Sequence, residues 1–542
     1  MFPRLTEAQI ERVANLGTRR KVEAGEIVFE VGDRDTAFFV VLEGELEILR
    51  PLVSGEERVV LHGRGEFTGE INMLSGRRAL VRGRMARDGE LLVVDREHLR
   101  LLVQRDAELS EILMRAFILR RVGLVAQGGG PLVLVGSRHS AGTMKLREFL
   151  TRNAQPFTYE DVEADPAVQA LLDRFQIGVD QVPVVICAEG KVCKNPTVES
   201  LARELGLSPT LDANVVRDLV IVGAGPAGLA TAVYAASEGL DVLVLETTAP
   251  GGQAGTSSRI ENYLGFPTGI SGEELAGRAF AQAEKFGADL AIGRRAVRLD
   301  CDSKPYKIIL DDGEVLQTRA LVIASGVKYR RPDLVELPRF ESTGVFYSAT
   351  HLEAQLCEGG HVAIVGGGNS AGQAAVFLSQ YATSVRVLVR GEGLAESMSR
   401  YLIQRIGGCS NVSVHARTVI EALEGETWLE RIRCRHVDTG VRETLPIRHV
   451  FMMTGADPHT TWLKGCVRLD DKGFIKTGAD LRADDLAEGH WPLVRAPFLL
   501  ETTIPGVFAV GDARAGSAKR VAAAVGEGAI CVQLAHRALL EL

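Results

Sequence analysis

The chain has 542 residues, 46% of them hydrophobic and 24% charged, an ordinary composition for globular domains and a length that suits about three or four of them. Its formal net charge of −8, with no basic block, argues against nucleic acid or an anionic membrane as a partner. No apolar run approaches the roughly 18 to 20 residues of a membrane span, and the first residues lack a signal-peptide core. We therefore expect a cytoplasmic protein.

The eight cysteines are scattered along the chain, and neither a C-x-x-C pair nor zinc-ligand spacing occurs. This usage is typical of a reducing cytosol and predicts neither a disulfide staple nor a metal site. Cys187 and Cys193 flank a predicted turn at 189–190. A two-residue hairpin would pair residue 187 with residue 192 and turn Cys193 to the opposite face, so we expect no disulfide between them.

Residues 1 to about 125 are predicted to form short strands, such as 26–30 and 38–42, followed by a helical stretch at 97–122. A glycine-rich linker follows at 127–130. The next segment is predicted to alternate as β-α-β-α-β-β-α, with strands at 131–135, 156–162, 182–186 and 191–193 and helices at 142–153, 166–175 and 198–205.

From residue 218 onward, strands alternate with helices, which predicts doubly wound parallel sheets. An apolar strand at 219–222 leads into Gly223-Ala224-Gly225-Pro226-Ala227-Gly228 and an alanine-rich helix, and the next strand ends in Glu246. The glycines permit a tight turn and a close approach of a pyrophosphate, the helix N-terminus stabilises its charge, and Glu246 can bind ribose hydroxyls. This pattern predicts a dinucleotide site.

The glycine turn is followed by further motifs at 250–253, 260–263, 324–326 and 505–512. Through these motifs, residues 218–542 resemble the low-molecular-weight thioredoxin reductase family. The resemblance implies that FAD is bound, with Asp512 on the ribitol chain, Gln253 near the isoalloxazine, and residues 519–522 covering the ring. The residues that it assigns to FAD are Gly223, Gly225, Pro226, Ala227, Gly228, Glu246, Gly252, Gln253, Asn262, Gly326, Gly511, Asp512, Arg520, Val521 and Ala522.

A second glycine turn follows the strand at 361–365 and predicts a nicotinamide nucleotide site made by Gly366, Gly368, Asn369, Ser370 and Ala371. The next strand ends in Arg390 rather than in an acid, so we favour NADPH over NADH, because arginine pairs well with a 2′-phosphate. Glu392 opposes this interpretation, and an Arg390 that is merely solvated at a strand end remains the alternative.

The family's redox motif, G-V-x-x-C-A-T-C, is replaced at residues 344–351, where Ser348 and His351 stand in place of the two cysteines. Histidine cannot carry electrons as a disulfide, but it can move a proton near neutral pH. His351 and Ser348 are therefore our candidate catalytic residues, and the alternative is that they only fill the vacated space. Cys357, six residues beyond His351, has no evident partner.

Residues 131–207 resemble a thioredoxin or glutaredoxin fold, through the strand before Ser140, the Val182-Pro183 pair, whose proline is cis in that family, and 195–197. Ser140 and Thr143 take the cysteine positions, and hydroxyls cannot exchange with disulfides at neutral pH. We expect this domain to be a spacer or a docking surface without redox chemistry.

Residues 1 to about 125 resemble a cyclic nucleotide-binding domain, through the segment 67–79. The resemblance implies that Glu70 accepts from the ribose 2′-hydroxyl and that Arg78 pairs with the cyclic phosphate, with Arg77 as its competitor. Gly69 and Ala79 belong to the same site. Thr68 replaces a glycine and Ala79 offers no hydroxyl, so binding of a nucleotide such as cAMP and a domain that has lost its ligand both stay open.

The sequence therefore predicts an NADPH-linked FAD oxidoreductase that passes electrons to oxygen, a quinone, a ferredoxin-like protein or another small molecule, under control of a cyclic nucleotide. The alternatives are a non-catalytic sensor and a disulfide reductase that uses other thiols. By resemblance, we expect a homodimer. The predicted domains are 1–126 (cyclic nucleotide), 131–207 (thioredoxin-like), 218–341 and 459–542 (FAD), and 342–458 (NADPH).

Overall fold

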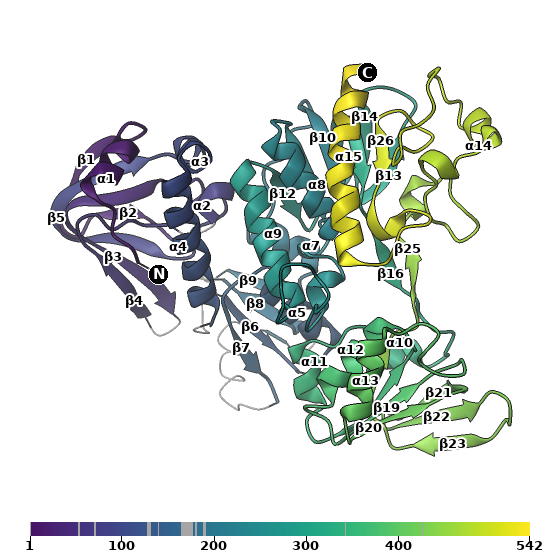
Figure 1. Ribbon diagram of the computed structural model, residues 1–542. Coiled ribbons are helices and arrows are strands. Elements are labelled where there is room, and N and C mark those ends of the chain that lie inside the picture. The colour runs from purple at the N-terminus through teal and green to yellow at the C-terminus, as the bar shows by residue number, and fades with distance from the viewer. Residues whose placement is uncertain are drawn as a thin grey trace.

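The computed structural model describes residues 2–52, 55–69, 72–126, 132–138, 140–163, 177–178, 181–187, 191–341, 343–426 and 428–541. Four regions are arranged as Figure 1 shows: an N-terminal antiparallel sheet with helices, a small mixed sheet, and two Rossmann regions. Glu70, the linker at 127–130 and the helix predicted at 166–175 lie outside the described residues. Within the described part, none of the helices is long and apolar enough to cross a membrane.

The N-terminal region has an antiparallel sheet of order β1-β5-β3-β4, with β2 on β5. Helix α4 packs against it through Phe117, which meets Phe38 and Phe67 ring to ring. Aromatic side chains thus form the centre of this core. The elements are α1 (Glu7–Ala14), β1 (Thr18–Val22), β2 (Ile27–Phe29), β3 (Phe38–Leu52), β4 (Gly55–His62), α2 (Asn72–Ser75), β5 (Arg82–Val94), α3 (Arg96–Arg105) and α4 (Ala107–Ala126).

The next region, called here the α5 region (residues 132–207), has a sheet of order β7-β6-β8-β9 in which only β6 and β7 are parallel. Ser140 is the N-cap of α5, and its hydroxyl accepts from the Thr143 amide. The Val182–Pro183 peptide is cis. The elements are β6 (Leu132–Gly136), α5 (Ala141–Arg152), β7 (Phe157–Asp161), β8 (Val184–Ile186), β9 (Val192–Lys194) and α7 (Val198–Glu204).

The predicted register of the β8–β9 hairpin is wrong. Ile186 pairs with Val192, and the Cys187 amide donates to the Lys191 carbonyl, so residue 187 stands opposite 191 rather than 192. Cys193 pairs with Val185 and therefore shares a face with Cys187. The expectation of two free thiols agrees with the structure, although the geometric reason for it was mistaken.

The first Rossmann region has a seven-stranded sheet of order β12-β11-β10-β15-β14-β13, with β26 beside β15. Strands β10, β11, β12, β15 and β26 are parallel, as predicted. Helices α8 and α15 pack on this sheet, and α9 packs on α8 (Figure 1). The elements are β10 (Val216–Val222), α8 (Pro226–Ser237), β11 (Val242–Glu246), α9 (Gly272–Phe286), β12 (Asp289–Ile292), β13 (Ala296–Asp300), β14 (Tyr306–Leu310), β15 (Val315–Ile323), α14 (Ala483–Glu488), β26 (Val507–Ala509) and α15 (Val521–Glu541).

The second Rossmann region has a parallel sheet of order β17-β24-β18-β19-β20 and a three-stranded antiparallel sheet, β21-β22-β23. The antiparallel pair β16 (Val327–Tyr329) and β25 (Ala456–Pro458) joins it to the first (Figure 1). The elements are α10 (Leu337–Phe340), β17 (Val345–Phe346), α11 (His351–Leu356), β18 (His361–Val365), α12 (Asn369–Leu378), β19 (Ser384–Leu388), α13 (Arg400–Gly408), β20 (Val412–His415), β21 (Thr418–Glu424), β22 (Arg431–His436), β23 (Arg442–Leu445) and β24 (His449–Met452).

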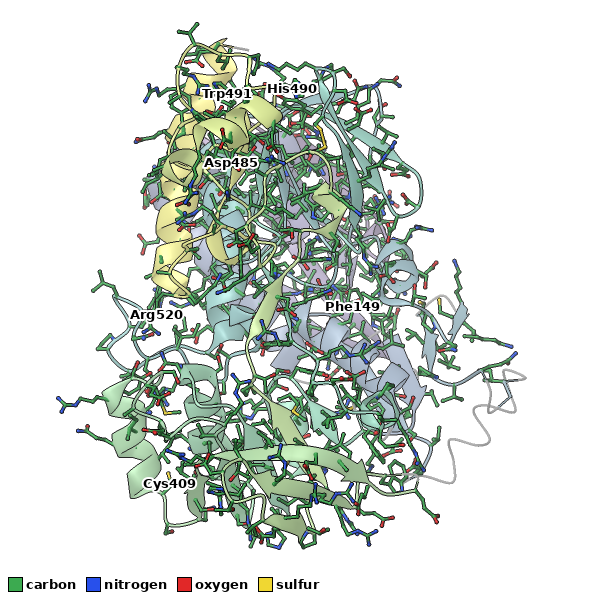
Figure 2. All side chains as sticks on the ribbon, turned by 90° about the vertical axis from the view of Figure 1, so that its right-hand side faces the viewer. Phe149, Cys409, Asp485, His490, Trp491 and Arg520 are labelled. Atoms are coloured by element: carbon green, nitrogen blue, oxygen red, sulfur yellow. A yellow bond between two sulfur atoms is a disulfide. The ribbon has the colours of Figure 1, made fainter. Side chains whose placement is uncertain are left out.

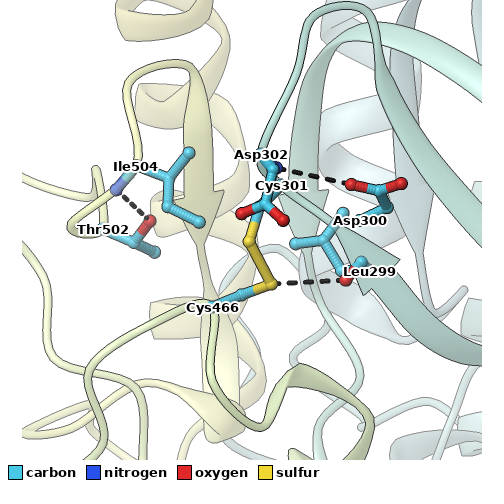
Figure 3. Close-up of a disulfide and its surroundings, with 7 residues drawn as sticks. All are labelled: Leu299, Asp300, Cys301, Asp302, Cys466, Thr502 and Ile504. Carbon is cyan, nitrogen blue, oxygen red and sulfur yellow. Dashed lines mark hydrogen bonds between the residues drawn. A yellow bond between two sulfur atoms is a disulfide. The ribbon is translucent and has the colours of Figure 1, made fainter. Parts of the chain in front are cut away.

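A disulfide joins Cys301, just after β13, to Cys466 (Figure 3). The expectation that the cysteines form no staple is therefore wrong. The two residues are 165 positions apart, and they meet because the chain returns to the first Rossmann region after the second is complete. The bond therefore links the two sequence segments of the first Rossmann region.

Candidate functional site

A cavity of about 610 Å³ lies at the junction of the two Rossmann regions and the α5 region. This volume falls within the ~300 to 1,000 Å³ of small-molecule sites. Twelve of the residues predicted to bind FAD line it: Gly223, Gly225, Pro226, Ala227, Glu246, Gly252, Gln253, Gly326, Gly511, Asp512, Arg520 and Val521. Gly228, Asn262 and Ala522 are not among the lining residues. Figure 2 shows Arg520 beside the end of α15 that faces the second Rossmann region.

The first glycine turn is shaped to receive phosphate. Gly223 has φ +108°, and a Cβ there would lie 2.3 Å from the Ala324 carbonyl oxygen, so only glycine fits. At Gly225 the nearest atom to a Cβ would be the Gly252 Cα at 3.9 Å, which leaves the space in front of α8 open. Gly225 is the N-cap of α8 and has no side chain to occupy the helix amides. These amides therefore face the cavity, and the turn fits a dinucleotide pyrophosphate.

Glu246 ends β11 and lines the cavity, as predicted. Its carboxylate accepts from the backbone amides of Ala224 and Thr248, both at 2.9 Å. The side chain therefore also fixes the glycine turn, a role that the sequence did not indicate.

Gln253 donates from Nε2 to the Val327 carbonyl at 2.7 Å, which holds its amide at the cavity wall. Asp512 also lines the cavity, and burial raises its pKa.

The second glycine turn repeats this construction. Gly366 has φ +140°, and a Cβ there would lie 2.3 Å from the Met453 carbonyl oxygen. Gly368 is the N-cap of α12, Ala371 is fully buried, and the Asn369 Oδ1 accepts from the Ser399 amide at 2.7 Å. Ser370 lines the large cavity, so this turn reaches the same space as the first.

The end of β19 carries Arg390, which is exposed. The opposing charge of Glu392 is taken up by Arg417, whose Nη2 lies 2.6 Å from its carboxylate. Arg417 also donates from its backbone amide to the Gly391 carbonyl at 3.0 Å. Two arginines therefore stand at this strand end, where one was predicted.

A second cavity lies in the N-terminal region. It is lined by apolar side chains together with His62, Gly69, Arg77, Ala79 and Arg120. Arg78 is not among the lining residues, and a Cβ on Gly206 of the α5 region would lie 3.0 Å from its Nε. The structure therefore brings Arg77 to the cavity in place of Arg78.

A family model described as pyridine nucleotide-disulphide oxidoreductase matches residues 217–528, more than half of the chain. The chain belongs to this family. A model of the cyclic nucleotide-binding domain matches residues 19–106. The protein is thus a flavoprotein oxidoreductase of the thioredoxin reductase-like class with an N-terminal cyclic nucleotide-binding domain.

Two curated relatives illustrate the likeness. The thioredoxin reductase of Mycoplasmopsis pulmonis is 30% identical over 327 residues, which cover 59% of this chain and 96% of that protein. The thioredoxin reductase of Mycolicibacterium smegmatis is 31% identical over 330 residues, which cover 61% and 98%. Among solved structures, Lactococcus lactis thioredoxin reductase in the FR conformation is 28% identical with a TM-score of 0.54, and covers 60% of this chain and 100% of that chain.

This pyridine nucleotide-disulphide oxidoreductase has Ser348 and His351 at the two positions where the thioredoxin reductase motif has cysteines. Ser348 lines the large cavity, whereas His351 does not. His351 is exposed at the start of α11, with Nδ1 3.2 Å from the Tyr381 hydroxyl and its ring edge-on to Phe377. The structure therefore places only Ser348 of this pair against the cavity.

Several lining residues escaped the sequence analysis. Glu353 lines the cavity, and burial raises its pKa, although hydrogen bonds from Thr350 act in the opposite direction. Tyr329 also lines it, and burial raises the pKa of its phenol. The capping box Thr350-x-x-Glu353 was visible in the sequence but indicates only a helix start. Nothing in the sequence near Tyr329 could have indicated its role.

The N-terminal cavity has an unusual electrostatic character. Burial lowers the pKa of His62 to about 4, with a further lowering by the charge of Arg120, so the imidazole is neutral at pH 7. Burial also lowers the pKa of Arg120 to about 10, and its guanidinium stacks 4.7 Å from the centre of the Phe67 ring. Two arginines in a cavity whose other walls are mostly apolar, apart from His62 and Thr36, suit an anion that carries an apolar part.

Proposed function

We propose that this chain is an NADPH-dependent FAD oxidoreductase whose electron acceptor is not a disulfide of its own. The observation that carries the proposal is the composition of the large cavity. It combines the glycine turn, Glu246 and Asp512 with Ser348, and none of its described lining residues is a cysteine. When bound, FAD supplies a two-electron carrier between the nicotinamide and the acceptor.

The chain's own residues would hold the two nucleotides in place. The amides at the start of α8 would bind the FAD pyrophosphate, Glu246 a ribose, and Gln253 would orient the ring system. The amides at the start of α12 would bind the pyrophosphate of NADPH, and Arg390 its 2′-phosphate. Ser348 and Glu353, which line the cavity, are our candidates for holding a proton beside the acceptor.

Cys357, the free cysteine nearest in sequence to residues 344–351, gives little support to disulfide reduction. Cys357 is fully buried, and burial raises its pKa to about 12. A thiol of this kind is a poor nucleophile, because the thiolate is the reactive form. We therefore favour oxygen, a quinone, a ferredoxin-like protein or another small molecule as the acceptor.

Oxidation of NADPH should be followed with oxygen, a soluble quinone, a ferredoxin and an aromatic disulfide as acceptors, in wild type and in Cys357→Ser. We expect turnover with one of the first three and equal, slow turnover of the disulfide by both proteins. Rapid disulfide reduction that is lost in Cys357→Ser would contradict the proposal.

We further propose that a cyclic nucleotide in the N-terminal cavity regulates this activity. Arg77 lines that cavity, yet its Nε lies 3.7 Å from Oε1 of Glu284 on α9 of the first Rossmann region, and both side chains are buried. The Arg77 guanidinium also stacks on Phe280 of α9, 4.6 Å from the ring centre. A phosphate that binds Arg77 would compete with Glu284 for the same cation.

Helix α9 supports a link from this contact to the flavin site. At its other end the Gly272 amide donates to the Ser257 carbonyl at 2.8 Å, and a Cβ on Gly251 would lie 2.4 Å from Ala276. Gly251 precedes two residues that line the large cavity, Gly252 and Gln253. The N-terminal cavity holds only about 120 Å³, less than the ~300 Å³ of ordinary ligand sites, so a nucleotide must displace lining groups to enter.

Calorimetry with cAMP should give binding heat in wild type and in Arg78→Ala, and none in Arg77→Ala. Arg78 is the matched control, because it has the same charge one position along the chain. If the wild type gives no heat, or if Arg78→Ala alone abolishes it, the proposed site is wrong. Ligand-bound wild type should also differ from the free protein in its rate of flavin reduction by NADPH.

The α5 region is proposed to be a thioredoxin-like domain without redox chemistry. Its strand order, the cis Pro183, and the close packing of Pro183 on Gly142, where a Cβ would lie 3.2 Å from the proline Cδ, support this fold. The Ser140 hydroxyl caps α5 and so has a structural role, and Thr143 is fully buried. The domain limits given above and the homodimer remain our predictions.

A further inference from the structure

Helix α5 contributes one face to the large cavity. Met144, Glu148 and Arg152 follow one another at intervals of four residues, so they lie on the same side of the helix, and all three line the cavity together with Lys145. The α5 region therefore forms part of the wall that surrounds the proposed flavin site. This region is therefore more than a spacer between the N-terminal region and the Rossmann regions.

Arg152 is the most firmly held of these side chains. It is 14% exposed, and its Nη2 donates to the Gly252 carbonyl at 2.9 Å, while Nη1 lies 3.3 Å from Oε1 of Glu148. The next residue, Asn153, donates from Nδ2 to the Thr248 carbonyl at 3.0 Å. These contacts lock the end of α5 onto the loop that precedes Gln253.

The charge of Arg152 acts on titratable groups of other elements, one of which, Tyr329, lines the cavity. It acts to lower the pKa of Tyr329 and of Glu273, in both cases against the larger effect of burial, which raises them. Glu148, the nearest anion, opposes it and acts to raise the pKa of Tyr329 and of Glu353. Arg152 and Glu148 thus contribute opposite fields to one partly desolvated space, where charges are weakly screened.

We infer that Arg152 is a positioning residue for the flavin, which the α5 region supplies, and that its guanidinium favours the negatively charged reduced form over the neutral oxidised form. The inference rests on the proposed function, because it requires FAD in this cavity. It follows that the reduction potential of the flavin depends on a residue from outside the two Rossmann regions. The carboxylate of Glu148 must instead disfavour the negatively charged reduced form.

The test is the two-electron reduction potential of FAD in the full-length holoprotein, measured against reference dyes. Arg152→Gln should lower the equilibrium constant for reduction about tenfold, which is about 30 mV for a two-electron couple. Glu148→Gln should raise it, since it leaves the arginine uncompensated. Arg152→Lys should stay close to wild type, because it keeps the charge.

Arg147→Gln is the matched control. Arg147 belongs to the same helix and carries the same charge, but its guanidinium stacks on Tyr159, 4.3 Å from the ring centre, and it does not line the cavity. The charge of Arg147 reaches Glu353 from outside the cavity wall, so the potential of Arg147→Gln should change much less than that of Arg152→Gln. A potential that changes in the same direction in Arg152→Gln and Glu148→Gln, or in neither, would overturn the inference.

Two results separate this inference from the function on which it rests. Wild-type protein that binds no FAD would contradict the proposed function itself. If wild-type protein binds FAD and is reduced by NADPH, but substitutions at residues 148 and 152 leave the reduction potential unchanged, only the inference about Arg152 is contradicted. If Arg152→Gln does not fold, Glu148→Gln still decides, because the absence of a positive change is sufficient to reject the charge argument.

Discussion

Gly223 shapes the proposed flavin site through its backbone conformation. Its φ of +108° and the 2.3 Å that would separate a Cβ from the Ala324 carbonyl oxygen leave no room for a side chain. Gly223→Ala should therefore weaken FAD binding by more than about tenfold, since the turn must move away from the pyrophosphate. Flavin content after purification and titration with FAD would measure this.

Gly239→Ala provides the control for that substitution. Gly239, just beyond α8, has φ +88°, but no atom lies within 4 Å of a Cβ placed there. Gly239→Ala has a similar backbone strain but no steric clash, so this variant should keep its FAD. Equal loss of FAD in both variants would show that strain, and not the shape of the turn, is responsible.

His62 gives the N-terminal region a pH dependence. Its pKa is about 4 in the folded chain, against an ordinary value of about 6.5 once unfolded. The unfolded state therefore gains a proton first as pH falls, and stability that is present above about pH 6.5 is lost toward about pH 4. Between about pH 7 and about pH 5 the loss should be about 2 kcal/mol.

Hydrogen exchange of the β3 and β4 amides, corrected for the intrinsic effect of pH, would measure this loss in wild type and in His62→Gln. The variant cannot take up the proton, so its protection should fall much less on acidification. An identical fall in both proteins would contradict the assignment to His62.

The arginine pair 77 and 78 illustrates what residue types alone leave undecided. The sequence favoured Arg78 for the phosphate and kept Arg77 as its competitor. The choice depends on which side chain packs on Phe280 of α9, just over 200 positions away, and no local pattern encodes this contact. Gly223 and Glu246, in contrast, belong to a local strand-turn-helix unit, and the sequence was sufficient to predict them.

At the scale of elements, periodicity predicted the parallel strands and helices of both Rossmann regions, because buried parallel strands form continuous apolar runs. The β8–β9 hairpin was predicted with the wrong register. A shift of one residue in the pairing moves every side chain after the turn to the other face of the sheet, so the predicted face of Cys193 was wrong as well. Helix α5 was also predicted, but its contact with the flavin cavity depends on how the α5 region docks.

The end of β19 makes a prediction about nucleotide choice. Arg390→Ala should raise the KM for NADPH about tenfold, about 1.4 kcal/mol, and leave the KM for NADH nearly unchanged, because only NADPH has the 2′-phosphate. Steady-state kinetics with both nucleotides measure this in one variant. Equal changes for the two nucleotides would show that Arg390 does not contact the 2′-phosphate.

At the scale of the whole molecule, the Cys301–Cys466 bond closes a loop that contains the entire second Rossmann region. Sequence reasoning missed it because the partners are 165 residues apart and neither lies in a recognisable spacing. A cross-link of this kind restricts the unfolded chain and typically stabilises by about 2 to 4 kcal/mol.

Cys301→Ser should therefore lower the temperature at which the first Rossmann region unfolds and releases its flavin, which fluorescence would detect. Cys409→Ser replaces a free cysteine at the end of α13 (Figure 2) and should leave that temperature unchanged. Reductant should lower it in wild type and in Cys409→Ser, and have no effect on Cys301→Ser. Equal behaviour of the two variants would contradict a stabilising role for the bond.

We propose that NADPH reduces an FAD bound between the two glycine turns. An anaerobic titration of the purified holoprotein with NADPH, monitored at the flavin absorption band, is the decisive measurement. We expect rapid bleaching near one equivalent of NADPH, with no further equivalent consumed by a disulfide. An oxidised band that persists, with and without cAMP, would contradict it and would favour a sensor in which the flavin is structural.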